Sequence, residues 1–275
     1  MPGPRAQERA YRCDVHTHTL YSRHAYSTLE ENVREAAERR IELLGVTEHF
    51  SDMLFPTRDL RNFQYFANLG CWPRSWHGVT LLRGVEADIV DLSGHLYGHD
   101  TLAGRFGVGV GTGPGTLKDM VFGKVDYAIA SVHNHDWADG APLATTTEMY
   151  IRALSDPRVL IVGHPGRAGV PFELDPVLEA ARDQHKLIEI NEHSLNTPEG
   201  HDRSYVPCRR IAERCAELGV GIAVNSDAHI SYDVGRFEAV PALLDELDFP
   251  ADLIATRSAD AFLAALTAAG LPVAL

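Results

Sequence analysis

The sequence predicts an α/β fold in which a parallel sheet is covered by helices. Two observations predict it: short apolar segments alternate with helical segments about seven times, and most apolar segments end in a histidine or a carboxylate. Seven strand–helix units in 275 residues suit a barrel better than a doubly wound open sheet, although the sequence alone leaves both folds open.

The predicted strands are short runs rich in valine, isoleucine and leucine. They cover residues 13–18, 43–47, 79–85, 126–132, 159–163, 187–191 and 220–225. Helices are predicted at 29–40, 61–68, 145–154, 175–185, 203–218, 234–247 and 259–268. Ser27 is the expected N-cap of the first helix, and Glu30 completes a capping-box pattern.

No low-complexity linker or internal repeat divides the chain, so a single domain is predicted over residues 1–275, with an N-terminal tail at 1–11. A glycine-rich insertion at 88–116 favours turns and a hairpin over a helix. It is either a surface insertion or a loop that folds over a site as a lid.

The composition excludes several classes of protein. A net charge of −13 argues against a general nucleic-acid-binding surface. No apolar run approaches the length of a membrane span, and the polar N-terminus lacks the apolar core of a secretory signal. The four cysteines form no C-x-x-C pair, so a reducing, cytoplasmic setting is expected.

The first strand carries the pattern from which a metal site is predicted. His16 and His18 are two residues apart, so a strand would point both imidazoles to one face. A pair of surface histidines is the alternative for this segment alone. Other potential ligands lie where the remaining strands end, at His49, Glu86, His133, His164, Asp227 and His229. Because the carboxyl ends of barrel strands share one rim, these groups are expected to converge on a metal site.

Six ordered motifs resemble those of one family. They are DVHTHT at 14–19, VTEH at 46–49, GVEADI at 84–89, SVH at 131–133, GHPG at 163–166 and NSDAH at 225–229. The chain resembles the PHP (polymerase and histidinol phosphatase) family, and most closely its YcdX-type probable phosphatases. The resemblance implies a distorted (βα)7 TIM-like barrel with a trinuclear metal centre at the C-terminal ends of the strands.

The same resemblance implies nine metal ligands, and every position is filled here. One ion would be held by His16, His18, Glu86 and Asp227; a second would share Glu86 and add His133 and His164; the third would take His24, His49 and His229. Imidazole and carboxylate donors suit zinc, with manganese or iron as alternatives, better than calcium or magnesium.

The predicted reaction is hydrolysis of a small phosphate monoester by a metal-bound hydroxide. Glu86, Asp227 and His18 are the predicted catalytic residues at the centre. Arg23, Arg74, Arg167 and His193 are the candidates for contacting the substrate.

Three alternatives remain open at this stage. A PHP nuclease or nucleoside-phosphate phosphatase would use aromatic residues such as Phe63, Tyr65, Phe66, Trp72 and Trp76 to stack a base. An amidohydrolase-type enzyme often has a lysine at the position of His133. A non-catalytic metal-binding or interaction module would have lost ligands. The sequence does not identify the physiological substrate, the native metal or the oligomeric state.

Overall fold

The computed structural model describes residues 11–55, 57, 59–103 and 115–275. Its main sheet has seven parallel strands whose order follows the sequence. They are β1 (Cys13–Thr17), β2 (Leu43–Val46), β5 (Val79–Asp88), β6 (Tyr127–Ser131), β7 (Val159–Val162), β8 (Leu187–Asn191) and β9 (Ile222–Asn225). Two short strands pair with β5: β3 (His49–Phe50) runs parallel to it, and β4 (Ser75–Trp76) runs antiparallel.

The first and last strands approach each other, so the sheet is nearly closed. A parallel bridge joins Thr17 to Ala228 directly after β9. The backbone N–H of His18 donates to Ala228 O at 2.9 Å, and that of Asp227 donates to His16 O at 2.9 Å. The structure therefore confirms the predicted barrel and not the alternative open sheet.

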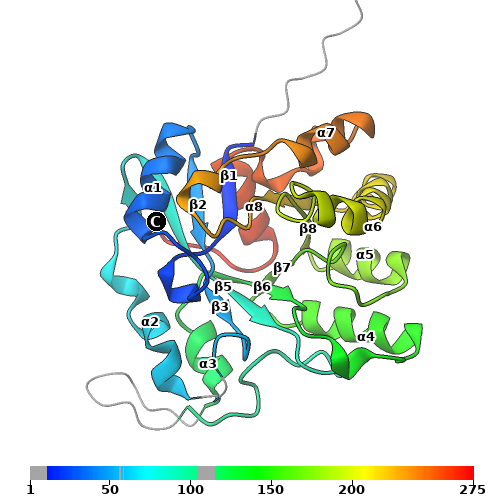
Figure 1. The fold of residues 1–275 in the computed structure, drawn as a ribbon, viewed down its shortest axis with the longest axis horizontal. Coiled ribbons are helices and arrows are strands. Elements are labelled where there is room, and N and C mark those ends of the chain that lie inside the picture. The colour runs from blue at the N-terminus through cyan, green and yellow to red at the C-terminus, as the bar shows by residue number, and fades with distance from the viewer. Residues whose placement is uncertain (1–10, 56, 58, 104–114) are drawn as a thin grey trace, which may run out of the picture.

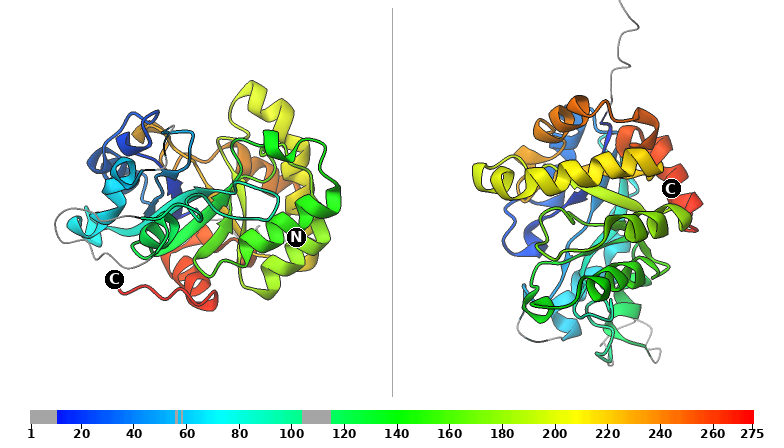
Figure 2. Two further views of the ribbon diagram at one scale, coloured as in Figure 1. Left: turned by 90° about the horizontal axis from the view of Figure 1, so that it is seen from below. Right: turned by 90° about the vertical axis from the view of Figure 1, so that its right-hand side faces the viewer.

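Helices surround the barrel, as Figures 1 and 2 show. They are α1 (Leu29–Glu38), α2 (Gln64–Ala67), α3 (Leu117–Phe122), α4 (Leu143–Leu154), α5 (Leu174–Asp183), α6 (Pro198–Leu218), α7 (Ala239–Glu246) and α8 (Ala259–Ala268). Short 3-10 segments lie at Leu20–Ser22, Leu60–Phe63, Leu69–Cys71, Asp136–Ala138, Ser231–Asp233, Ala251–Leu253 and Ala255–Arg257. In the described residues no helix is both long and apolar enough to cross a membrane.

The start of α1 differs by one residue from the prediction. The N-cap is Thr28, and its capping-box partner is Glu31, whose carboxylate accepts the Thr28 N–H at 2.7 Å. Ser27 is instead buried, and its hydroxyl accepts the N–H of Ser231 at 2.8 Å. The sequence offers both serine and threonine as caps, and the tertiary contact of Ser27 decides between them.

The predicted tail and insertion are only partly described. Of the tail only Tyr11 is described, and residues 104–114 of the insertion also lie outside the described residues. The described part of the insertion contains the expected hairpin, since Ile89 and Leu96 form an antiparallel bridge. A lid function of the insertion stays a prediction.

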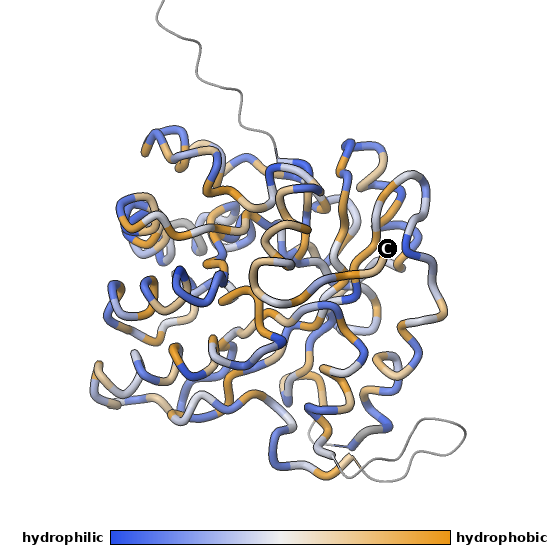
Figure 3. The backbone as a smooth tube through the Cα atoms, turned by 180° about the vertical axis from the view of Figure 1, so that it is seen from behind, coloured by the Kyte–Doolittle hydropathy of each residue, from blue (hydrophilic) through white to orange (hydrophobic). Residues whose placement is uncertain are grey.

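Hydrophobic residues concentrate along the strands, whereas the helices alternate polar and apolar positions (Figure 3). At the amino end of the barrel, Tyr127 is fully buried and its hydroxyl donates to Val15 O at 2.6 Å. Phe262 of α8 packs against the Tyr127 ring at 5.7 Å between centroids. The amino end is therefore filled by side chains, and the carboxyl end remains for the polar residues.

We expect Gly45→Ala to destabilise the barrel, because the Tyr127 ring leaves no room for a methyl group. A Cβ at Gly45 would lie 2.0 Å from Tyr127 Oη and 2.9 Å from Val15 Cα. Overpacking of this kind costs about 1–3 kcal/mol in the free energy of unfolding, which thermal or urea unfolding measures. The control is Gly70→Ala, where the Cβ meets no atom within 4 Å. Equal midpoints for the two variants would contradict this account of the barrel interior.

Candidate metal centre

Nine side chains predicted as ligands lie together at the carboxyl end of the barrel. They come from β1 and the loop after it, from β3 and β5, and from the segments that follow β6, β7 and β9. The nine residues are His16, His18, His24, His49, Glu86, His133, His164, Asp227 and His229. Overlapping sets of three donors, His18–His49–His229, His16–Glu86–His164, His16–His18–Asp227 and His49–Glu86–His133, each lie within 4.8 Å of one another. Such overlap can accommodate more than one metal ion.

Glu86 lies in the middle of the cluster and uses both carboxylate oxygens. Its Oε1 is 2.9 Å from His164 Nε2 and 3.3 Å from the Nε2 atoms of His16 and His133. Its Oε2 is 2.7 Å from His49 Nδ1. Because the two oxygens face different histidines, this carboxylate is placed to bridge two cations.

Asp227 closes the cluster on the other side. Its Oδ1 lies 3.2 Å from His18 Nε2 and 3.5 Å from His16 Nε2. Its Oδ2 accepts from Arg167 Nη2 at 2.8 Å. His18 and His16 therefore face two carboxylates, Asp227 and Glu86.

His24 and His229 form the outer edge of the cluster, nearest to solvent. Their Nε2 atoms are 2.9 Å apart, and His229 Nδ1 donates to the backbone carbonyl of Asp227 at 2.9 Å. The rings of His24 and His49 stack with centroids 4.9 Å apart. The three histidines assigned by resemblance to one ion thus lie side by side.

The Ser22 hydroxyl determines which nitrogen of His18 carries the proton. Ser22 Oγ donates its single hydrogen to Glu48 Oε2 at 2.6 Å. It can therefore only accept from His18 Nδ1, which is 3.0 Å away. His18 carries its proton on Nδ1 and presents the lone pair of Nε2 to the cluster.

Two buried carboxylates hold two further histidines in the same orientation. Glu189 Oε1 accepts from His16 Nδ1 at 2.8 Å, and Asp88 Oδ1 accepts from His133 Nδ1 at 2.6 Å. Both rings then direct Nε2 to the centre, as metal-ligating histidines do when a carboxylate holds the other ring nitrogen.

Glu189 and Asp88 are absent from the predicted set, although each carries a signal in the sequence. Glu189 is the single charged residue of the strand LIEIN. Asp88 follows Glu86 at the spacing that places both on one face of a strand.

Several buried polar atoms of the cluster lack a hydrogen bond within the described part of the chain. They are His16 Nε2, His18 Nε2, both ring nitrogens of His49, Glu86 Oε2, His164 Nδ1 and Asp227 Oδ1. Buried polar groups are normally paired, and leaving one unpaired costs about 1–3 kcal/mol. Divalent cations would satisfy this set of nitrogens and carboxylate oxygens, so the residues fit a metal centre.

The electrostatics of the cluster favour the states that bind cations. Burial alone would raise the pKa of Glu86, but His16, His133 and His49 hold that pKa well below its usual range. Burial and the neighbouring His49 lower the pKa of His18 well below its usual value. An anionic Glu86 therefore lies among neutral imidazoles such as His18.

His16 and His133 are exceptions, because burial alone would lower the pKa of His133 but Glu86 and Asp88 raise it well above its usual value. Burial alone would lower the pKa of His16, but Glu189, Glu86 and Asp227 raise it well above its usual value. A cation bound among these carboxylates would replace that proton, which is the usual coupling between metal binding and proton release.

Two members of the cluster have a left-handed backbone, which residues with a side chain rarely adopt. The φ angles are 29° at His164 and 56° at Asp227. Glu189 Oε2 accepts the N–H of His164 at 2.7 Å, and the barrel closure holds the N–H of Asp227. Strain of this kind costs about 1–3 kcal/mol per residue and is typical of functional sites.

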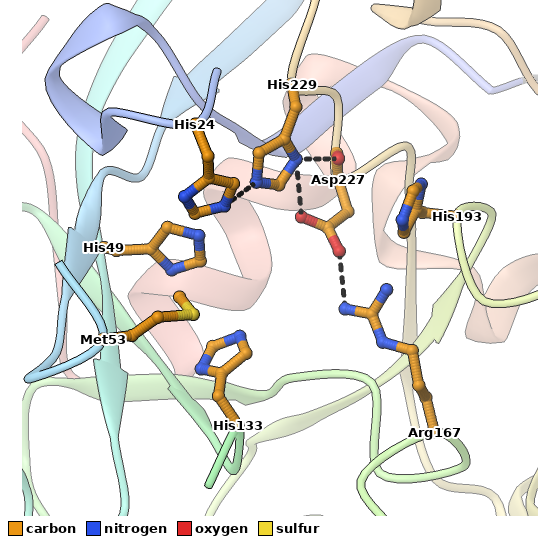
Figure 4. A pocket seen from close by; sticks show the side chains of 8 residues that line it. All are labelled: His24, His49, Met53, His133, Arg167, His193, Asp227 and His229. Atoms are coloured by element: carbon orange, nitrogen blue, oxygen red, sulfur yellow. Dashed lines mark hydrogen bonds and ion pairs between the residues drawn. The ribbon is translucent and has the colours of Figure 1, made fainter.

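A cavity of about 300 Å³ opens over the cluster. It is lined by His24, His49, Met53, His133, Arg167, His193, Asp227 and His229. Figure 4 shows His24, His49, Met53 and His133 on one side of it, and Asp227, Arg167 and His193 on the other. Met53 is an apolar wall that the sequence analysis did not anticipate.

The four predicted substrate contacts divide into two pairs. Arg167 and His193 line the cavity. Arg23 does not line it, and its guanidinium lies 4.0 Å above the Phe55 ring. Arg74 lies at the amino end of the barrel, where it holds both oxygens of Asp126, the residue before β6. The expectation that Arg74 contacts the substrate is therefore corrected, because Asp126 holds it away from the cavity.

Residues 14–193 match the PHP domain family. Three similar curated proteins are each named a probable phosphatase. The one from Caldanaerobacter subterraneus is 36% identical over 247 residues, 90% of this chain and 87% of that protein. The proteins from Clostridium acetobutylicum and Acetivibrio thermocellus are both 34% identical to this chain. The match to the first covers 89% of each chain, and the match to the second covers 90% of this chain and 92% of that protein.

Two solved structures share the fold. One is histidinol phosphate phosphatase from Lactococcus lactis in complex with zinc, L-histidinol and phosphate. It has a TM-score of 0.51 and 17% sequence identity, and the match covers 87% of this chain and 95% of that chain. A chain in the structure of archaeal ribonuclease P with mature tRNA has a TM-score of 0.51 at 13% identity, covering 93% and 90%. At these identities the similarity supports the fold alone.

Proposed function

Because the chain belongs to the PHP domain family, we propose that it is a metal-dependent phosphatase that hydrolyses small phosphate monoesters. The observation that carries the proposal is the convergence of nine donor residues at the carboxyl end of the barrel, several with buried atoms that lack a hydrogen bond. The names of the curated relatives, over about nine-tenths of this chain, supply the reaction class.

The proposed centre holds three divalent cations. His16, His18, Glu86 and Asp227 would hold the first; Glu86, His133 and His164 the second; His24, His49 and His229 the third. Zinc is the proposed ion, because imidazole and carboxylate donors suit it and the solved histidinol phosphate phosphatase contains it. When bound, such cations supply Lewis-acid stabilisation of the phosphoryl oxygens and an acidified water.

The chain's own side chains position the substrate. Arg167 borders the cavity opposite His49 and His133, with its guanidinium held by Asp227 at 2.8 Å. A guanidinium matches the geometry of phosphate oxygens, so we assign Arg167 to hold the phosphoryl group. His193 is exposed at the mouth and is assigned to contact the rest of the substrate. The small volume of the cavity favours a small monoester.

The aromatic residues named for the nuclease alternative are not placed to stack a base directly over the cluster. Phe63 and Phe66 are fully buried in the core, and Tyr65 and Trp72 are partly buried against it. Trp76 is partly buried as well. None of the five lines the cavity over the cluster, although Tyr65, Trp72 and Trp76 line a separate one. Ligand loss, the mark of a non-catalytic module, is not observed at any of the nine positions.

The test of the proposed function compares p-nitrophenyl phosphate with bis(p-nitrophenyl) phosphate. We expect zinc-, manganese- or iron-loaded protein to hydrolyse the monoester at least ~100-fold faster than the diester, since the cavity suits a terminal phosphoryl group. A preference for the diester would support the nuclease alternative. Hydrolysis of neither, with the metal bound, would support the non-catalytic module.

A substitution of His24 distinguishes a trinuclear metal centre from a binuclear one. It is exposed in the loop after β1 and meets the cluster through His229 and His49. We expect His24→Ala to bind one metal ion fewer than the wild type, as measured by elemental analysis after dialysis. His185→Asn, an exposed histidine outside the cluster, is the control. Equal metal content in His24→Ala and the wild type would refute the trinuclear assignment and leave a binuclear centre possible.

A further inference from the structure

A second group of potential metal ligands lies on the hairpin that follows β5. Asp91, His95 and His99 each offer a donor atom, and these atoms lie within 4.8 Å of one another. None of the three lines the cavity over the nine-residue cluster. We propose that Asp91, His95 and His99, here called the hairpin cluster, form a separate site for one divalent transition-metal ion.

The backbone that carries the hairpin cluster is held rigidly. Val90 N–H donates to His95 O at 2.9 Å, and Tyr97 N–H donates to Asp88 O at 2.8 Å. Leu96 and Tyr97, between the two histidines, are buried in the core. The positions of His95 and His99 are therefore set before any ion binds.

Two glycines allow this hairpin to pack tightly. Gly94 and Gly98 have φ angles of 76° and 74°, in the left-handed region that favours glycine. A Cβ at Gly94 would lie 2.5 Å from Met149 O in α4, and one at Gly98 would lie 2.9 Å from Phe50 Cζ. The hairpin is thus pressed against α4 and the aromatic core.

The hydrogen bonds of the hairpin cluster orient both imidazoles in the same way. His95 Nδ1 donates to Asp91 Oδ2 at 2.8 Å, and His99 Nδ1 donates to Leu96 O at 3.2 Å. Each ring then carries its lone pair on Nε2. The two rings are nearly parallel, with centroids 4.3 Å apart and 8° between their planes. Because stacked rings direct their lone pairs in parallel, the exposed His95 ring would have to tilt for both Nε2 atoms to reach one ion.

Asp91 acts on His95 as Glu189 acts on His16 in the main cluster. Its Oδ1 accepts the backbone N–H groups of Ser93 and His95 at 2.9 and 3.2 Å, so the carboxylate is held in place. A carboxylate that binds the second nitrogen of a metal-ligating histidine raises the basicity of that ligand. We assign the Nε2 atoms of His95 and His99 as the ligands and Asp91 as the group that positions His95.

The chemistry of the donors selects the class of ion. A pair of imidazoles favours Zn²⁺, Ni²⁺ or Cu²⁺ over Mg²⁺ or Ca²⁺, which prefer oxygen. The side chains of Asp91 and His95 are 40% and 52% exposed, so an ion can enter from solvent and keep water on its remaining positions.

The test is equilibrium dialysis of the full chain against Zn²⁺ or Ni²⁺, with the bound metal counted by elemental analysis. We expect His95→Asn/His99→Asn to bind one ion fewer than the wild type, with unchanged phosphatase activity and unchanged unfolding midpoint in the absence of metal. His77→Asn/His185→Asn removes two exposed histidines elsewhere and is the matched control, expected to bind as the wild type does. Asparagine is used because it tolerates the left-handed backbone of the control positions.

Equal metal content in the wild type and His95→Asn/His99→Asn would overturn the site. Loss of an ion from the control pair as well would also overturn it, because binding would then reflect exposed histidines in general. Asp91→Asn is expected to weaken binding of this ion about 10–100-fold, and unchanged binding would overturn the assignment of Asp91. None of these outcomes depends on the chain being a phosphatase.

Discussion

Glu86→Gln is expected to lower kcat/KM for a phosphate monoester at least about 1,000-fold, equal to about 4 kcal/mol of transition-state stabilisation. Glu86 is fully buried, and its two oxygens face His164, His16 and His133 on one side and His49 on the other. Glutamine keeps the shape but removes the negative charge and one of the two acceptor oxygens. The cations that share this carboxylate would then bind weakly or in the wrong place.

Steady-state kinetics together with metal analysis check this prediction. Glu148→Gln is the matched control, because Glu148 is exposed on α4 and pairs only with Arg152 among the described residues. We expect the control to stay within about twofold of the wild type, since an exposed ion pair contributes about 0–1 kcal/mol. Turnover above a tenth of the wild-type value in Glu86→Gln with full metal content would rule out the bridging role.

Removal of the metal ions is expected to abolish hydrolysis and to lower the melting temperature. Dialysis against EDTA would leave buried atoms without a hydrogen bond among the described residues, namely His18 Nε2, both ring nitrogens of His49, Glu86 Oε2 and Asp227 Oδ1. Binding at 100 times Kd stabilises a folded protein by about 2.7 kcal/mol per site, which corresponds to roughly 5–10 °C for a chain of this size. Activity assays and thermal unfolding before and after dialysis measure both effects.

Adding zinc or manganese back should restore activity and melting temperature together. The control is Mg²⁺ or Ca²⁺, which the imidazole donors bind poorly and which should restore neither. Hydrolysis that continues at the original rate in EDTA, with the metal shown to be absent, would exclude a metal-dependent mechanism.

The ligand positions could be predicted because they depend on the order of elements along the chain. Each short strand is recognised from its apolar run, and the polar residue at its end follows directly. Once the strands are parallel and the barrel is closed, their carboxyl ends share one rim. This is why His49, Glu86, His133 and His164, which are far apart in sequence, meet in the structure.

Other features depend on contacts that no local pattern contains. Arg74 is a predicted substrate contact, but Asp126 holds it at the opposite end of the barrel from the cluster. The hydrogen bond between His16 and Glu189 joins residues 173 positions apart. Side-chain pairs at such separations are decided by the packing of the whole barrel.

The sequence by itself indicated the fold class and eight of the nine candidate ligands, because strand period and strand-end position are local properties; the ninth, His24, followed from the resemblance to the PHP family. Tertiary structure alone decided how those ligands are held. It placed Asp88, Glu189 and the Ser22–Glu48 pair behind the histidines, so that Nε2 of His16, His18 and His133 faces the centre. It also placed Tyr127 across the amino end of the barrel against Gly45. The physical reason is that hydrogen-bond direction and close packing exist only between groups that the folded chain brings within contact distance.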